Sequence, residues 1–127
     1  LHEAGVEVPA ERIRESDFTS TGGYAAAVQL LAEKPPSAIF ASNDVMAAGV
    51  LHAARERGLD VPRDLSIIGF DDTAIATAIW PPLTTVRWPI RAMARSAARK
   101  LIDPKAAGEE QSLFLTDFIA RASVAPR

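Results

Sequence analysis

The sequence contains no cysteine, so the chain can form neither a disulfide bond nor a thiolate metal site. It has no apolar run of about 18 residues, which excludes a transmembrane helix, and its first residues lack the basic and apolar regions of a signal peptide. The net charge of −2 gives no overall attraction to nucleic acid. We therefore expect no membrane partner and a reducing compartment, the cytoplasm.

The remaining composition is that of one folded domain. Of the 127 residues, 48% are hydrophobic and 24% are charged, which supplies a core and argues against disorder. The chain begins with Leu1, and the segment "LHEAG" reads as the end of a helix stopped by Gly5. We therefore expect this chain to be a piece of a longer protein.

The first part of the chain predicts a strand followed by a helix. Apolar and polar residues alternate at 13–18, which indicates a short strand. A helix should follow, capped by Ser20 or Thr21 and ended by the Pro35-Pro36 pair. Its apolar residues recur at helical spacing on one face: Tyr24, Val28 and Leu31.

Two apolar runs without alternation, "SAIFAS" and "LSIIGF", predict strands that are buried on both faces of a parallel sheet. The helix between them starts at Asn43 or Asp44, and Gly58 occupies the position of a left-handed stop. This strand–helix–strand order predicts an α/β fold with an open, mostly parallel sheet flanked by helices.

The second half of the chain departs from this pattern. We interpret "AIATAIW" as a loop, because Pro81 and Pro82 forbid a helix there, and "LTTV" as a short strand. A helix should begin near Pro89 and end by Gly108. The segment "SLFLTDFIARASV" alternates as a strand pair or one long strand does. One face of the predicted helix carries small and apolar side chains: Ile90, Met93, Ala94, Ala97, Ala98 and Leu101.

Four polar residues follow the two buried strands: Asn43, Asp44, Asp71 and Asp72. Ligands of open α/β proteins bind beyond the carboxyl ends of the strands, so both pairs would share a crevice if the strands are neighbours. Three readings remain open: helix caps and solvated turns, a divalent-metal or phosphoryl site, or hydrogen bonds to a polyol. Because no lysine that could handle phosphate lies near these loops, the polyol explains the residue types better.

Aromatic residues and missing motifs bear on the same question. Phe18 and Trp88 are candidate platforms for the apolar face of a sugar, and core packing is the alternative for each. The sequence lacks a P-loop, a G-x-G-x-x-G motif and a G-x-S-x-G nucleophile elbow. We assign no catalytic residue, no metal ligand and no cofactor, and we expect no enzyme.

Several motifs occur in a fixed order: "ND" at 43–44, "MAAG" at 46–49, "GLDVPRDLSIIGFDD" at 58–72 and "PPLTT" at 81–85. Together with "ARAS" near the end, they closely resemble the effector-binding domain of LacI/GalR-family bacterial transcription regulators. The resemblance extends over roughly residues 17–123, and the ordered combination is highly specific.

The resemblance implies a two-lobed fold similar to periplasmic sugar-binding proteins, with effector between the lobes. This chain would be its C-terminal portion. Residues 1–83 would form the C-terminal lobe, 84–112 a segment of the N-terminal lobe, and 113–127 a strand that returns to the C-terminal lobe. The family's N-terminal helix-turn-helix is absent from this chain, so operator DNA would be bound only through that missing part.

The resemblance also implies roles for single residues. Asn43 and Asp71 match the amide and the acid that bond effector hydroxyl groups, and Phe18 matches an aromatic that stacks on the ligand. Trp88 stands where relatives often carry a polar residue, commonly glutamine, followed two positions later by an aromatic, where this chain has Ile90. This departure leaves the identity of the ligand open.

Relatives in this family dimerise through the C-terminal lobe, by the helix after "ND" and the segment before "PPLTT". An apolar stretch in a loop also indicates an interface on its own, although it could instead pack under its own lobe. We expect a homodimer through five residues: Ala48, Leu51, Ile75, Ile79 and Trp80.

The resulting hypothesis is the sugar-sensing and dimerising part of a transcriptional regulator. The alternatives are a periplasmic sugar-binding protein of a transport system and an enzyme that holds a divalent metal at Asp44 and Asp71. The apolar face of the helix at 90–102 would need the N-terminal lobe to cover it, so we expect the isolated chain to self-associate.

Overall fold

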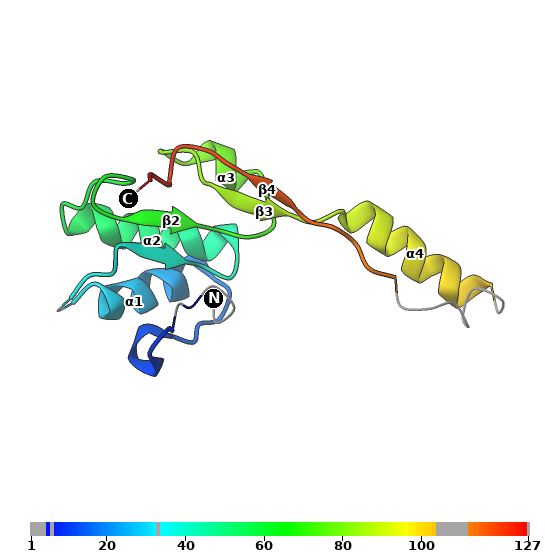
Figure 1. Cartoon of the computed structure of the whole chain (residues 1–127), viewed down its shortest axis with the longest axis horizontal. Helices are drawn as coiled ribbons and strands as arrows, with labels where there is room; N and C mark the ends of the chain where they lie inside the picture. Colours follow the sequence, from blue (N-terminus) through cyan, green and yellow to red (C-terminus); the bar gives the residue numbers. More distant parts are fainter. Residues whose placement is uncertain (1–4, 6, 33, 104–111, 127) are drawn as a thin grey trace.

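The computed structural model describes residues 5, 7–32, 34–103 and 112–126. Figure 1 shows a layered α/β body from which a two-stranded ribbon carries one helix away to the side. In chain order the elements are η2 (Ala10–Arg12), α1 (Ser20–Leu30), β1 (Ala38–Phe40), α2 (Asp44–Glu56), β2 (Ser66–Ile68), α3 (Ile75–Ala78), β3 (Thr85–Arg87), α4 (Ile90–Ile102) and β4 (Asp117–Ile119).

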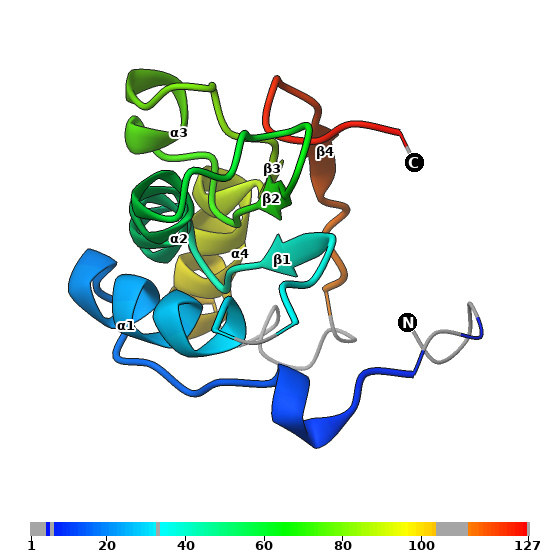
Figure 2. The same cartoon turned by 90° about the vertical axis from the view of Figure 1, so that its left-hand side faces the viewer.

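The predicted βαβ unit is confirmed. Strands β1 and β2 are parallel neighbours, with Ile39 opposite Ile67. A parallel bridge from Ile68 to Thr84 places the chain before β3 beside β2. Helices α1 and α2 cover one side of these strands (Figure 2), and the buried residues between them form the core.

Helix α2 begins and ends as its sequence predicts. The side chain of Asn43 caps it by accepting a hydrogen bond of 2.7 Å from the amide of Met46. At the other end, Gly58 has a φ of +70° and donates to the carbonyl of Arg55. Leu59 donates to Ala54, which completes a Schellman motif.

Helix α1 packs on α2 at two glycines. A methyl group at Gly23 would collide with the backbone of Met46, and one at Gly49 would collide with the carbonyl of Ser20. The two helix backbones therefore approach more closely than larger residues would permit. The prediction that Ser20 or Thr21 caps α1 is wrong: Thr19 is the cap, accepting a bond of 2.9 Å from the amide of Gly22.

Three further predictions about the elements are corrected. Residues 13–18 lie outside any strand, because the described part of the chain offers them no neighbouring strand to pair with. Strand β1 is buried at Ile39 only, and Phe40 is exposed, because the helices cover one side of β1. The stretch "AIATAIW" contains the short helix α3, which ends before Pro81 rather than being prevented by it.

The end of the chain forms the ribbon that leads to α4. Strands β3 and β4 are antiparallel, with Val86 opposite Phe118, so the returning segment contributes one three-residue strand. Helix α4 follows Pro89 and ends at Ile102, and Gly108, its predicted end, lies outside the described residues. No residue of α4 is buried, and Leu101 is 88% exposed. Among the described residues, no helix is long and apolar enough to cross a membrane.

Candidate functional site

The two polar clusters lie side by side. The amide of Asp44, at the start of α2, donates a hydrogen bond of 2.9 Å to the carbonyl of Phe70, just after β2. Because β1 and β2 are adjacent and parallel, their carboxyl ends open at the same edge of the sheet. The loops at 42–44 and 70–72 therefore meet at the position where α/β folds bind ligands.

Phe18 joins this edge through Asn43. The Nδ2 atom of Asn43 donates to the carbonyl oxygen of Phe18 at 3.2 Å, while its Oδ1 atom caps α2. Phe18 has a φ of +62°, which turns the chain sharply before α1, and the residue is 65% exposed. The Asn43 amide thus lies beside the backbone of an exposed aromatic residue.

Asp71 lies in an unusual backbone conformation beside the same edge. Its φ is +106°, and its amide donates to the carbonyl of Val86 at 2.9 Å. Burial, and then the negative charge of Asp44, raise the pKa of the Asp71 carboxyl. No hydrogen bond or ion pair reaches this carboxylate from the described part of the chain, so its oxygens remain available to a ligand.

Trp88 packs next to this loop. Its ring lies edge-on to the ring of Phe70, with centroids 6.0 Å apart. Asn43, Asp71 and Trp88 follow β1, β2 and β3, and Phe18, just before α1, is attached to this edge through its bond to Asn43. We call them the rim, and its members are Phe18, Asn43, Asp71 and Trp88. An amide, a carboxylate and two aromatic rings suit a ligand with hydroxyl groups and an apolar face.

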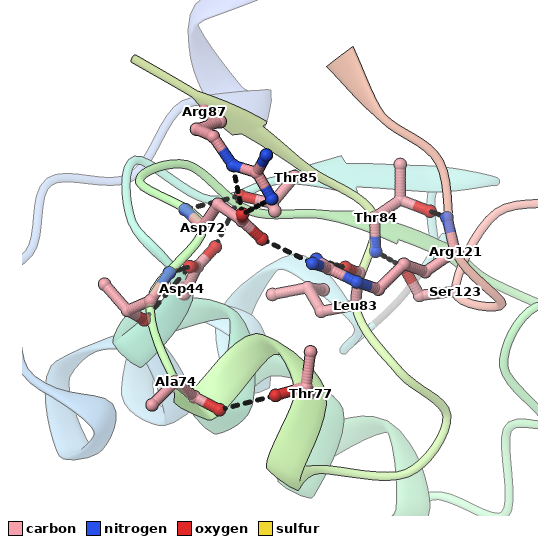
Figure 3. A network of polar contacts seen from close by, with 11 residues as sticks. Asp44, Asp72, Ala74, Thr77, Leu83, Thr84, Thr85, Arg87, Arg121 and Ser123 are labelled. Atoms are coloured by element: carbon pink, nitrogen blue, oxygen red, sulfur yellow. Dashed lines mark hydrogen bonds and ion pairs between the residues drawn. The ribbon is translucent and has the colours of Figure 1, made fainter. Parts of the chain in front are cut away.

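Asp44 has a structural role. Its side chain is fully buried and accepts three hydrogen bonds: from the amide of Thr73 at 2.7 Å, from the hydroxyl of Thr73 at 3.0 Å, and from the hydroxyl of Thr85 at 2.6 Å. This network, drawn in Figure 3, fixes the loop after β2 and the start of β3 to α2. Within the described residues, no group of three potential metal ligands is found.

Asp72 binds two arginines from the crossing segments. Arg87, at the end of β3, donates from Nε at 2.6 Å, and Arg121, shortly after β4, donates from Nη2 at 2.5 Å (Figure 3). Burial alone would raise the pKa of the Asp72 carboxyl, but the hydrogen bonds and charges of Arg121 and Arg87 outweigh it and lower the pKa. Sequence reasoning missed this cluster, because its members are up to 49 residues apart.

The five residues expected at a dimer interface are not equally accessible. Trp80 is 74% exposed, and Ile75, Ile79 and Ala48 are partly covered. Leu51 is 5% exposed and belongs to the core of the lobe itself. The side chain of Arg55, on α2, donates a hydrogen bond to the carbonyl oxygen of Trp80, so α2 and the segment after α3 share one surface.

The α/β fold is that of a periplasmic-binding-protein-like domain. The profile of the periplasmic binding protein-like domain matches residues 1–124, and the chain belongs to that family, in the form that occurs in LacI-family transcriptional regulators.

The relatives in sequence are DNA-binding regulators. The chain is 39% identical over 121 residues to the HTH-type transcriptional regulator MalR of Streptomyces coelicolor, with 93% of this chain and 35% of that protein covered. It is 40% identical over 130 residues to the HTH-type transcriptional regulator DegA of Bacillus subtilis, with 99% and 38% covered. The chain thus spans about a third of the length of these relatives. They are transcriptional regulators, which agrees with the prediction that the chain is no enzyme.

Solved structures give the same result. The transcriptional regulator CelR in complex with cellobiose superposes with a TM-score of 0.85 at 34% identity, covering 96% of this chain and 38% of that one. The lac repressor dimer bound to operator and the anti-inducer ONPF superposes with a TM-score of 0.80 at 30% identity, covering 89% and 41%. The predicted fold class and family are confirmed.

Proposed function

We propose that this chain is the effector-sensing and dimerising part of a LacI-family transcriptional regulator, and that its effector is a sugar or a similar small polar molecule. The observation that carries the proposal is the rim: an available carboxylate, an amide and two aromatic residues that adjoin one edge of the sheet. Similarity to regulators over nearly the whole chain supports it.

The chemistry of the rim favours a neutral, hydroxyl-rich ligand. The carboxylate of Asp71 accepts from two hydroxyl groups at once, and the amide of Asn43 both donates and accepts. Phe18 and Trp88 provide the apolar surfaces on which a sugar ring stacks. Solved relatives hold cellobiose, ribose and glucose, which makes these three sugars the first to test.

Ligand binding would act on DNA through the relative position of two lobes. In this proposal, residues 1–83 and 113–127 belong to the C-terminal lobe, and 84–112 belong to the N-terminal lobe. A sugar held between the lobes stabilises one relative orientation, and the resulting population shift alters the spacing of the DNA-binding heads. The protein would therefore act in the cytoplasm, on operator DNA that this chain does not itself contact.

The homodimer is proposed to form on the surface shared by α2 and the segment after α3. Ala48, Ile75, Ile79 and Trp80 would contact the second copy, with Leu51 beneath them in the core. The exposed indole of Trp80 supports this assignment, because a large apolar side chain in water favours burial in an interface. A lac repressor dimer among the solved relatives supports it further.

Calorimetry on the natural protein that contains this chain tests the sugar site. Titration with cellobiose, ribose and glucose should give saturable heat for at least one of them. Asp71→Asn should then weaken binding by about 2 kcal/mol, roughly thirtyfold, because a charged acceptor is lost. Asp60→Asn, a matched loss of a carboxylate beyond the far end of α2, should leave binding unchanged. Equal binding by wild type and Asp71→Asn would contradict the role given to Asp71.

A further inference from the structure

We propose that Asp72 is a positioning residue that couples the rim to the two strands leading to and from α4, while making no contact with the ligand. The role proposed for Asp72 rests on the proposed function only in its last step, which is ligand binding at Asp71. The coupling itself is a property of the described chain and can be measured without a ligand.

The geometry places one carboxylate between two strands. Each oxygen of Asp72 serves a different arginine: Oδ2 accepts from Arg87, which ends β3, and Oδ1 accepts from Arg121, which follows β4. The side chain of Asp72 is 6% exposed, so water competes little for these bonds. We call the three side chains the clamp.

Arg121 extends the clamp to the start of the outgoing strand. Its Nη1 atom donates to the carbonyl of Leu83 at 2.8 Å, and its amide donates to the hydroxyl of Thr84 at 3.0 Å (Figure 3). The returning segment is thereby attached both to Asp72 and to residues 83–84. A movement of either strand relative to the lobe must disturb the carboxylate.

The clamp also holds the backbone that presents Asp71. Asp71 and Asp72 both have positive φ values, +106° and +53°, a region that L-residues adopt infrequently, although aspartate does so more often than most. The amide of Asp71 is held by the carbonyl of Val86, and that of Asp72 by the hydroxyl of Thr85 at 3.4 Å. Without the carboxylate bonds, two backbone contacts to β3 would remain to maintain this conformation.

The charge of Asp72 explains why an amide cannot replace it. One carboxylate neutralises part of the charge of two guanidinium groups, and asparagine would remove the ion pair that each of them makes with Asp72. Asparagine also has one acceptor oxygen instead of two, so it cannot serve both strands. Asp72→Asn is therefore a nearly isosteric change that opens the clamp.

Hydrogen exchange measured by mass spectrometry on the ligand-free chain tests the coupling. In Asp72→Asn, exchange should rise about tenfold or more at 70–72, 84–87 and 117–121, as expected when a buried charge pair is broken. Exchange in α1 and α2 should stay at the wild-type level, as it should throughout the control Asp60→Asn. Unchanged exchange in the three segments would overturn the proposal.

A milder variant distinguishes a local effect on the clamp from general unfolding of the chain. If Asp72→Asn raises exchange everywhere, Arg87→Met opens one arm of the clamp at a side chain that is 52% exposed. Its effect should be confined to 70–72 and 84–87, and Arg87→Lys should restore part of the protection. A rise spread evenly over α1 and α2 in Arg87→Met would show a general structural role and would overturn the proposal.

Sugar titration then separates this inference from the proposed function. In the natural protein, Asp72→Asn should weaken binding of whichever of cellobiose, ribose or glucose binds wild type by about tenfold, through loss of the Asp71 conformation. If Asp71→Asn abolishes binding while Asp72→Asn changes neither binding nor exchange, the coupling through Asp72 is contradicted and the proposed sugar-binding function is supported. If no sugar binds but the exchange pattern appears, the proposed sugar-binding function is contradicted, whereas the coupling through the clamp is supported.

Discussion

The hydroxyl of Thr85, at the start of β3, donates a hydrogen bond of 2.6 Å to the fully buried carboxylate of Asp44, at the start of α2. This bond joins the outgoing strand to helix α2, whose N-cap is the rim residue Asn43. Thr85→Val preserves shape and removes the donor, leaving part of a buried carboxylate unsatisfied. Chemical denaturation should show a loss of about 2 kcal/mol in the free energy of unfolding. Thr21→Val, at an exposed position, should lose less than about 0.5 kcal/mol.

Acid should weaken the clamp around Asp72. The pKa of this carboxyl is lower in the folded chain than the ordinary value of 3.8, so the unfolded chain takes up its proton first as the pH falls. The stabilisation from Asp72 is therefore complete above that ordinary value and is lost as the pH falls through the lower, folded-state pKa. Urea denaturation between pH 7 and pH 3 should give a steeper loss for wild type than for Asp72→Asn. Parallel curves for the two proteins would contradict this account.

Trp80 should contribute to self-association through the α2 surface. Trp80→Ala removes a large exposed apolar side chain from the proposed interface and should weaken the dimer by about 2 kcal/mol or more, as central aromatic residues do. Sedimentation velocity over a concentration series measures this directly. Phe40→Ala, a comparable loss from the exposed side of β1, is the matched control and should leave the dimer intact. Equal dimerisation in wild type and Trp80→Ala would contradict the assignment.

Helix α4 presents a second apolar surface that the isolated chain leaves uncovered. Leu101 and Ile102 are both exposed, and the face that includes Ile90 has no buried residue. We expect the isolated chain to bind a hydrophobic dye and to associate further. Leu101→Glu with Ile102→Lys should reduce both effects without lowering the free energy of unfolding by more than about 0.5 kcal/mol. A wild-type chain with low dye binding and a monomeric mass in light scattering would refute this expectation.

The close packing of α1 on α2 at Gly49 permits a stability test in which Gly58, a glycine outside that contact, is the internal control. Gly49→Ala would force a methyl group against the carbonyl of Ser20, so α1 and α2 must separate. Thermal unfolding should show a loss of roughly 1–3 kcal/mol or more, the usual cost of overpacking. Gly58→Ala meets open space and pays only for its positive φ, about 1 kcal/mol. A larger effect at Gly58 than at Gly49 would contradict this packing account.

Local sequence signals predicted much of the fold. The cap at Asn43 and the stop at Gly58 are determined by neighbouring residues, so the limits of α2 follow from the sequence. The βαβ pattern predicted a parallel sheet but left open whether β1 and β2 are neighbours, which the structure shows. The burial of β1 could not be predicted in this way. An apolar run does not reveal that one face of the strand lacks a covering layer, and Phe40 is exposed for that reason.

The sequence named the four rim residues as ligand-binding candidates, and this role stays a prediction. The family resemblance matched Phe18, Asn43 and Asp71, whereas Trp88 departs from the family and was named for its position after "LTTV". The roles of Asp44 and Asp72 depend on partners far along the chain. Hydrogen bonds over such distances have no periodic sequence signal, so the partners of these two acids could not be predicted.

A crystal structure of the natural protein with its sugar would show whether the rim binds a hydroxyl-rich ligand. The sugar that gives heat in calorimetry, whether cellobiose, ribose or glucose, would be used. We predict sugar oxygens within hydrogen-bond distance of the Asp71 carboxylate and the Asn43 amide, and a ring stacked on Phe18 or Trp88. A sugar bound elsewhere, with Asp71 and Asn43 contacting only protein or water, would contradict the account.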